Sequence, residues 1–176
     1  EAENAVTFSR LSPDGEEGYP GNLTAEVTYR LTPDGELAVS MKAETDDTTI
    51  VNLSCHAYWN LAGHDAGSIL DHRLMIDAER YTPVDDEKIP TGELAPVAGT
   101  AFDFRKARPI GQAMPPDGHD INFCLAQRGG EMHLAARLEH EPSGRALEIH
   151  TDQPGLQIYT GAELHSGLIG KDGVPY

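Results

Sequence analysis

The sequence contains no long apolar run. None of its 176 residues lies in a stretch that approaches the roughly 18 consecutive apolar residues of a membrane-spanning helix. The first ten residues, EAENAVTFSR, also lack the basic start and apolar stretch that mark a signal peptide. We therefore expect no membrane as a partner and predict a cytoplasmic location.

Basic residues are scarce relative to acidic ones. Lys and Arg number 13 against 29 Asp and Glu, which gives a formal net charge of -16 at pH 7. Such a surface repels the phosphate backbone of nucleic acid, so we expect no nucleic-acid partner. An anionic substrate would need a local basic pocket, and no cluster of Lys and Arg is evident. A neutral small molecule fits this composition better.

Cysteine is scarce too, and its placement excludes several kinds of site. Cys55 and Cys124 form neither a CxxC pair nor a zinc-ligand spacing, and their apolar-looking positions predict buried free thiols. His56, His64 and His72 stand eight residues apart, which is not a usual metal-ligand spacing, so no metal site is predicted. A P-loop, a dinucleotide-binding glycine pattern and a nucleophile elbow are also absent from the sequence.

The sequence does contain repeated two-residue alternation bounded by turn signals. Residues 24–31 and 36–43 alternate between apolar and polar side chains around the turn TPDG at 32–35, which predicts a β-hairpin. Further strands are expected at 5–11, 74–78, 119–125, 131–139, 145–151 and 156–159. No segment shows a helical period of 3.6 over a useful length. The pattern predicts an all-β antiparallel chain, either a sandwich or a barrel, with helix in short turns only.

The clearest alternation is in VNLSCHAYWNL at residues 51–61. The odd-numbered positions from Val51 to Leu61, which include Trp59, are all apolar. They predict a strand with one face packed against a core. The other parity carries an amide, a hydroxyl, an imidazole, a phenol and a second amide, with His56 at the centre. Such a row suits a polyhydroxylated ligand, and it is equally the pattern of an outer sheet face wetted by water. The pattern alone leaves both interpretations open.

Six sequence blocks follow one another along nearly the whole chain. They are GEEGYPG at 15–21, VNLSCHAYWNLAGH at 51–64, YTPVD at 81–85, IPTGELAPVAGTAFDFR at 89–105, GHDINF at 118–123 and PGLQIYTG at 154–161. In this order they resemble the aldose 1-epimerase family, also called galactose mutarotases. The resemblance implies a large antiparallel β-sandwich of the galactose mutarotase-like supersandwich type, here incomplete. It also implies that residues 1–176 form a single, partial domain.

The resemblance further implies an activity and the residues that perform it. Members of the family interconvert the α and β anomers of free aldohexoses such as galactose and glucose, without a cofactor. A base must take the proton of the anomeric hydroxyl while an acid protonates the ring oxygen as the ring opens. Carried over from the matching motifs, His56 would be that acid, and Asp120 and Gln157 would bind sugar hydroxyls. A histidine suits the acid role because its pKa lies near neutrality.

The chain departs from the family pattern at points that bear on activity. The family's general base is a glutamate in a motif that none of these acids matches: Glu131, Glu139, Glu141, Glu148 and Glu163. A further sugar-binding His and Arg of the family have no match either. We therefore expect an interior piece of a longer protein, inactive alone, for which a periplasmic location also stays open. Cys55 and Ala162 stand where the family commonly has Asn.

Two other functions stay open at this point. One is a non-catalytic carbohydrate-binding domain, which would be expected to have lost His56 or Asp120, whereas both are present. The other is an epimerase of phosphorylated hexoses within the same superfamily. That function needs basic residues around the pocket, and the strongly negative net charge argues against it. Each alternative has a sugar as its small-molecule partner.

Overall fold

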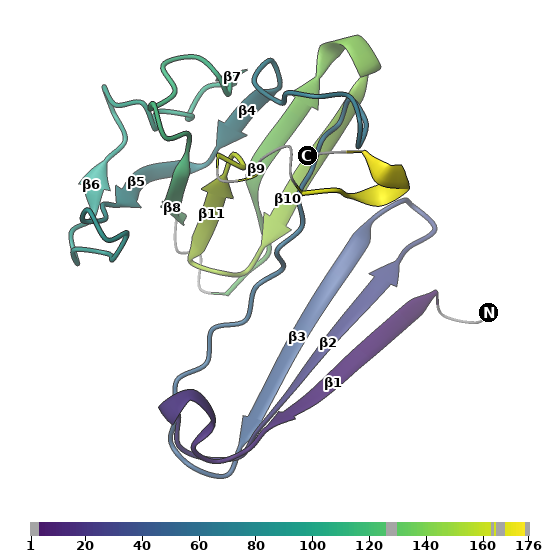
Figure 1. Ribbon diagram of the computed structural model, residues 1–176, viewed down its shortest axis with the longest axis vertical. Helices are drawn as coiled ribbons and strands as arrows, with labels where there is room; N and C mark the ends of the chain where they lie inside the picture. The colour runs from purple at the N-terminus through teal and green to yellow at the C-terminus, as the bar shows by residue number, and fades with distance from the viewer. Residues whose placement is uncertain (1–3, 126–129, 163, 165–167, 175–176) are drawn as a thin grey trace. The chain divides into compact units, whose positions relative to one another are not determined.

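The computed structural model describes residues 4–125, 130–162, 164 and 168–174 (Figure 1). The chain divides into two compact units, Glu1–Tyr58 and Trp59–Tyr176. Among the described residues, no helix is both long enough and apolar enough to cross a membrane.

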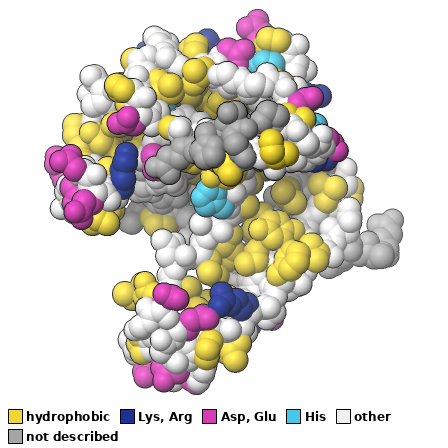
Figure 2. Space-filling model, viewed as in Figure 1, with side chains coloured by type: hydrophobic (Ala, Val, Ile, Leu, Met, Phe, Trp, Pro, Cys, Tyr) yellow, Lys and Arg dark blue, Asp and Glu magenta, His cyan; other side chains and the backbone are white. Residues whose placement is uncertain are grey.

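The first unit is built on one antiparallel sheet of three strands, in the order β1-β2-β3 (Figure 1). The strands are β1 (Ala5–Ser12), β2 (Leu23–Leu31) and β3 (Leu37–Thr45). The predicted hairpin is confirmed, because β2 and β3 pair in one unbroken register from Leu23 opposite Thr45 to Leu31 opposite Leu37. Apolar side chains lie at the molecular surface over this sheet (Figure 2). Phe8 on β1, for example, is 61% exposed.

The predicted strand at residues 51–61 is wrong. Residues 51–60 form no strand and pair with no strand among the described residues. Alternation sorts side chains by parity, but a strand also needs a neighbouring backbone to accept and donate its hydrogen bonds. The predicted core face is wrong as well, since Val51, Cys55 and Trp59 are all exposed. Leu61, at the end of the stretch, is the residue that is buried.

The second unit contains two four-stranded sheets, ordered β10-β9-β4-β7 and β11-β8-β5-β6. The strands of the first of these sheets are β4 (Arg73–Ile76), β7 (Arg108–Pro109), β9 (His133–His140) and β10 (Arg145–Thr151). The strands of the other are β5 (Ala78–Thr82), β6 (Ala95–Pro96), β8 (Asp120–Leu125) and β11 (Gly155–Tyr159). Helix in the described residues is confined to 3-10 turns at Glu16–Gly18, Glu141–Ser143 and Lys171–Gly173. The all-β antiparallel prediction is therefore confirmed.

The two sheets of the second unit are joined at Asp77. The sequence predicts a single strand over 74–78, whereas the chain leaves β4 after Ile76 and enters β5 at Ala78, in the other sheet. The amide of Asp77 donates to the carbonyl of Ala135, 2.8 Å away, and so the backbone stays hydrogen-bonded at the switch. One short stretch thereby contributes a strand to each sheet.

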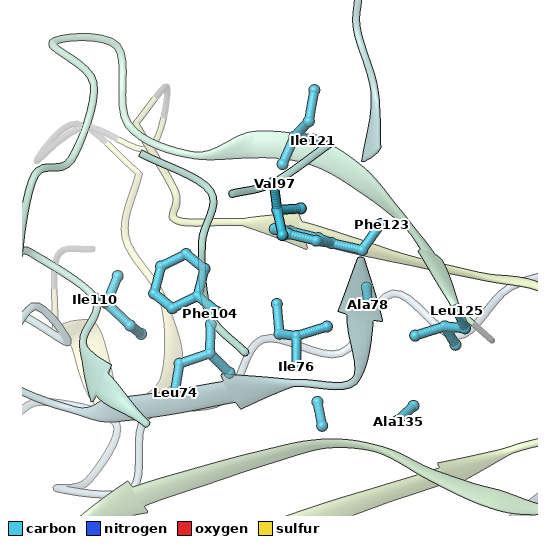
Figure 3. Close-up of a cluster of buried hydrophobic side chains, with 11 residues drawn as sticks. Leu74, Ile76, Ala78, Val97, Phe104, Ile110, Ile121, Phe123, Leu125 and Ala135 are labelled. Atoms are coloured by element: carbon cyan, nitrogen blue, oxygen red, sulfur yellow. The ribbon is translucent and has the colours of Figure 1, made fainter. Parts of the chain in front are cut away.

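The hydrophobic core of the second unit takes side chains from both sheets (Figure 3). Its buried members are Leu74, Ile76, Ala78, Val97, Phe104, Ile110, Ile121, Phe123, Leu125, Ala135 and Ala136. Phe104 and Phe123 meet edge to face with ring centroids 6.3 Å apart. Full burial of each large apolar side chain contributes about 1.5–3 kcal/mol, so this cluster holds the two sheets together.

Candidate functional site

Asp120 and Gln157 meet on two paired strands of the second unit. Asp120 begins β8, and Gln157 lies on β11, which pairs with β8 in antiparallel register. Gln157 stands opposite Asn122, so it is the diagonal neighbour of Asp120 on the same face. Gln157 Nε2 donates to Asp120 Oδ1 over 2.8 Å, and both residues are exposed. The structure thus brings together two of the three predicted site residues.

The outward direction of this pair follows from the alternation of β8. Ile121, Phe123 and Leu125 are buried in the core, so the side chains of even-numbered residues point away from it. Asp120 and Gln157 therefore stand on a face that is backed by packed apolar side chains. A face of this kind holds polar groups in fixed positions without burying them.

A tight contact fixes the start of β8 against the end of β11. The amide of Thr160 donates to the carbonyl of His119, and Thr160 Oγ1 accepts from the amide of His119, both over 2.9 Å. Gly118 precedes this contact with φ +74°, and a Cβ there would lie 2.5 Å from Thr160 Oγ1. The glycine in GHDINF is thus required by close approach and by a left-handed backbone. This contact sets the position of Asp120, the next residue along.

His119 is fully buried directly beside Asp120 in sequence. Its ring meets the rings of Phe102 and Phe104 edge-on, at centroid distances of 5.8 and 5.3 Å. Burial lowers the pKa of His119, because an apolar surrounding disfavours the charged ring, and Arg108 adds to this effect. Neither ring nitrogen of His119 makes a hydrogen bond of normal geometry with a described residue. The backbone of Ile110 lies near enough to the ring to favour its charged form, which opposes the effect of burial.

Asn122 and Thr82 continue the polar face, and we did not single them out from the sequence. Asn122 Nδ2 donates to Thr82 Oγ1 over 3.3 Å, which links β8 to β5. A Cβ on Gly155 would lie 2.7 Å from Asn122 Oδ1, so the glycine leaves room for the amide. The sequence feature that could have identified Asn122 is the alternation in GHDINF. Asn122 lies two residues after Asp120, so the side chains of both point to the same face of the strand.

His56 lies in the first unit, within the segment that forms no strand. Its side chain is exposed, and its ring lies 5.2 Å from the ring of Tyr58 at an angle of 37°. His56 and the pair of Asp120 and Gln157 thus belong to different units of the chain.

Two of the acidic side chains considered for the general base are already paired with a cation. Glu139 and Glu148 both bind the guanidinium of Arg137, and hydrogen bonds from Arg137 and then His150 lower the pKa of Glu148. A carboxylate with a lowered pKa is a weaker base. Glu163 lies outside the described residues.

Asp71, His72 and His140 form a cluster of potential metal ligands elsewhere in the second unit. One ligand-type atom from each lies within 4.8 Å of the others. His72 Nε2 accepts the amide proton of Leu61 over 3.1 Å, so a neutral ring carries its own proton on Nδ1, which faces Asp71 Oδ1 at 3.0 Å. A protonated nitrogen has no lone pair for a metal ion. The hydrogen bond from His72 also lowers the pKa of Asp71, so the cluster is best described as a hydrogen-bonded network.

A wide cleft of about 770 Å³ in the second unit is lined by charged side chains, among them Glu79, Asp103, Arg105 and Arg108. Arg105 binds both carboxylates, and its hydrogen bonds lower the pKa of Asp103 to about 2. Arg108 donates to the backbone carbonyls of three residues. These two guanidinium groups are already paired, and Lys106 is the remaining basic side chain that lines the cleft.

The chain matches known proteins along almost its whole length. The family model described as aldose 1-epimerase matches residues 1–175. The chain is 51% identical to galactose mutarotase from Sus scrofa and from Homo sapiens, covering 98% of this chain and 51% of each relative. It is 37% identical to aldose 1-epimerase from Escherichia coli (strain K12), covering 97% of this chain and 51% of that one. The chain therefore spans about half the length of the curated relatives it matches.

Solved structures agree with the sequence match. A crystal structure of galactose 1-epimerase from Lactobacillus acidophilus NCFM superposes with a TM-score of 0.81 at 33% identity, covering 94% of this chain and 50% of that one. An aldose epimerase homologue from C. elegans superposes with a TM-score of 0.83 at 28% identity, covering 100% of this chain and 54% of that one. The predicted fold class and the predicted resemblance are both confirmed. The chain belongs to the aldose 1-epimerase family.

Proposed function

We propose that the protein to which this chain belongs interconverts the α and β anomers of free aldohexoses such as galactose and glucose. The observation that carries the proposal is the hydrogen-bonded pair of Asp120 and Gln157, exposed on a packed sheet face in a chain of this family. The names of the relatives, galactose mutarotase and aldose 1-epimerase, support the choice of substrate and reaction.

In this proposal, Asp120 and Gln157 orient the sugar. Gln157 uses one N–H on Asp120 Oδ1, which leaves Asp120 Oδ2, Gln157 Oε1 and the second N–H of Gln157 for sugar hydroxyls. A carboxylate acceptor makes hydrogen bonds about twice as strong as neutral ones, so Asp120 would make the strongest of these hydrogen bonds to the sugar. The mutual hydrogen bond favours this orientation of the two side chains when no sugar is bound.

His56 would act as the general acid. It would donate its proton to the ring oxygen while a base takes the proton of the anomeric hydroxyl, and the ring would open to the free aldehyde. Rotation about the bond between C1 and C2 and reclosure would then give either anomer, with both proton transfers reversed. Each positioned proton transfer accelerates such a step by roughly 10²–10⁴-fold.

Polarimetry of freshly dissolved α-galactose with the full-length protein tests this proposal. Wild-type protein should accelerate the change in optical rotation, and His56→Asn should lower kcat by roughly 10²–10⁴-fold, because an amide cannot deliver the proton of an imidazolium. His150→Asn is the matched control, since His150 is exposed on β10 beside Glu148. No acceleration by wild-type protein would refute the function, and near-normal turnover by His56→Asn would leave the imidazole as a sugar ligand only.

The proposal includes a single mutarotase-like β-sandwich domain that contains residues 1–176. The family match at residues 1–175 runs through both compact units, which supports one domain rather than two. It also includes inactivity of the 176 residues alone, because no carboxylate here matches the family's glutamate base. Polarimetry of the isolated chain tests this point. Wild-type turnover would contradict it, and Glu163 would then be the first carboxylate to replace.

A cytoplasmic location is the last part of the proposal. Cys55 is an exposed free thiol, and Cys124 is free as well. Reducing compartments keep such thiols unpaired, whereas oxidising ones favour disulfides. Fractionation of cells that make the full-length protein would check this location.

A further inference from the structure

The chain just after the His56 segment is held by side chains distant in sequence. The amide of Leu61 donates to His72 Nε2 over 3.1 Å, in a buried hydrogen bond. Arg145 Nη1 donates to the carbonyl of Leu61 over 2.8 Å and to that of Ala62 over 3.4 Å. Both backbone groups of Leu61 are therefore bound, and its side chain is buried.

The ring of His72 is itself held in one orientation. It is fully buried and stacks on the ring of His140, with centroids 4.5 Å apart and planes 23° apart. Because Nε2 accepts from Leu61, the proton of the neutral ring lies on Nδ1 and is donated to Asp71 Oδ1 over 3.0 Å. His140 is bound in turn by Ser143 Oγ, 2.9 Å from its Nδ1. These contacts fix both the tautomer and the rotation of the imidazole.

We propose that His72 is a positioning residue for the reaction: its Nε2 fixes the amide of Leu61 and thereby sets the position of His56, five residues earlier. The inference rests on the proposed function of His56 as the acid. Five residues of chain span at most roughly 17 Å, so an anchor at Leu61 limits where the imidazole of His56 can lie. Residues 51–60 have no sheet partner among the described residues, and Leu61 is where the chain beyond them is first held by buried contacts.

The two variants at His72 separate positioning from mere stability. In the full-length protein, His72→Leu removes the acceptor for Leu61 and should lower kcat by roughly 10–100-fold, since a misplacement of 1 Å can lower a rate about 10²-fold. KM should change less than threefold, because Asp120 and Gln157 are untouched. His72→Gln can place Oε1 near the former Nε2 position and should retain most of kcat.

The decisive measurement is a double-mutant cycle with His56→Ala. If His72 acts through His56, His72→Leu should lower kcat no further once the imidazole of His56 is gone, because residues that act as a unit are not additive. An equal loss in both backgrounds would overturn the inference, and so would an unchanged kcat in His72→Leu alone. Full turnover by His56→Ala would instead refute the acid role itself, which distinguishes the two failures.

Two further variants keep the test decisive if His72→Leu does not fold. Arg145→Met removes the hydrogen bond from an exposed side chain to the carbonyl of Leu61. It should lower kcat by a smaller factor than His72→Leu does. That loss should also disappear in the His56→Ala background. His133→Leu makes the same change at a buried histidine whose ring contacts the backbone of Glu131, and it should leave kcat unchanged. A kcat for Arg145→Met equal to that of wild type would overturn the inference.

Discussion

The two units of the chain use the same antiparallel pairing but bury very different amounts of side chain. In the described part of the first unit, residues 4–58, Gly21 is the only buried residue. The whole hydrophobic cluster lies in the second unit. Phe8 on β1 is 61% exposed and Phe123 on β8 is 1% exposed, although both stand in alternating strands. Strand pairing is thus set by local pattern, whereas burial depends on what covers the sheet.

The same difference divides the proposed site. Asp120 and Gln157 stand on strands backed by the core, and Thr160 fixes the strand ends beside them. His56 stands in an exposed segment without strand pairing, whose downstream end is anchored at Leu61. The proposed binding groups therefore lie in the unit that contains the hydrophobic core, and the proposed acid lies five residues before the anchored Leu61.

The largest expected effect on stability comes from removing a buried aromatic side chain from the core. Phe123→Ala should lower the free energy of unfolding by about 3–5 kcal/mol, the usual loss when a buried aromatic ring is removed. Phe8→Ala in the same 176-residue chain should change it by less than about 0.5 kcal/mol. Urea denaturation measures both. If Phe8→Ala lowered the free energy of unfolding by more than about 2 kcal/mol, the ring of Phe8 would be buried in solution. The difference in burial between the two units would then be contradicted.

The next effect concerns sugar binding on the packed sheet. Asp120→Asn in the full-length protein removes the charged acceptor and should raise KM roughly 10–100-fold, because a hydrogen bond to a charged group contributes about 1.5–3 kcal/mol. Asp152→Asn, at an exposed turn where Asp152 binds Gln153, is the matched control. Initial rates over a range of galactose concentrations would show the change. A fall in kcat with unchanged KM would assign Asp120 to the chemical step instead.

A smaller effect is a pH dependence of stability in the packed unit. Burial lowers the pKa of His119 below its ordinary value of 6.5, so the unfolded chain binds more protons than the folded one. Above pH 6.5 the ring is neutral in both states and adds no pH dependence, and as the pH falls below 6.5 the folded state loses stability by up to about 1.4 kcal/mol per pH unit. His119→Phe cannot titrate and should lose less stability between pH 7.5 and pH 5.

Urea denaturation at the two pH values gives the comparison. His133→Phe makes the same substitution at another buried histidine and is the control for replacing an imidazole by a phenyl ring. Equal losses in wild type and in His119→Phe would show that His119 is not the group responsible.

The smallest expected effect is a difference between the two cysteines in their rates of reaction with a thiol reagent. Cys55 is exposed in the first unit, whereas Cys124 is half-buried and burial raises its pKa. A thiolate is the reactive form, so Cys55 should react faster than Cys124 with an aromatic disulfide reagent at pH 8. Single variants Cys55→Ser and Cys124→Ser assign the two phases. Equal rates would contradict the difference in exposure.

Local signals predicted most of the strands. The turn TPDG and the alternation on both sides of it specify the β2–β3 hairpin, because each pairing lies close in sequence. The same reasoning fails at residues 51–60, where alternation is present but no described strand pairs with the segment. It also places a single strand over 74–78, since no pattern reveals that Asp77 leads from one sheet into another.

The candidate site was predictable only as separate residues. Motif resemblance selected Asp120 and Gln157, but the hydrogen bond between them joins positions 37 residues apart, which only the sheet register reveals. The network of Asp71, His72 and His140 carries no motif at all. Its histidines look like isolated residues until β4 and β9 pair. Long-range packing decides such contacts, and sequence periodicity contains no information about it.

The most direct test of the proposed site is a crystal structure of the full-length protein with galactose bound. We predict that the imidazole of His56 lies within roughly 2.6–3.2 Å of the ring oxygen. We also predict that Asp120 and Gln157 contact hydroxyls of the same sugar molecule. A sugar bound away from Asp120, or His56 on the opposite side of a sheet from Asp120 and Gln157, would contradict the proposed site.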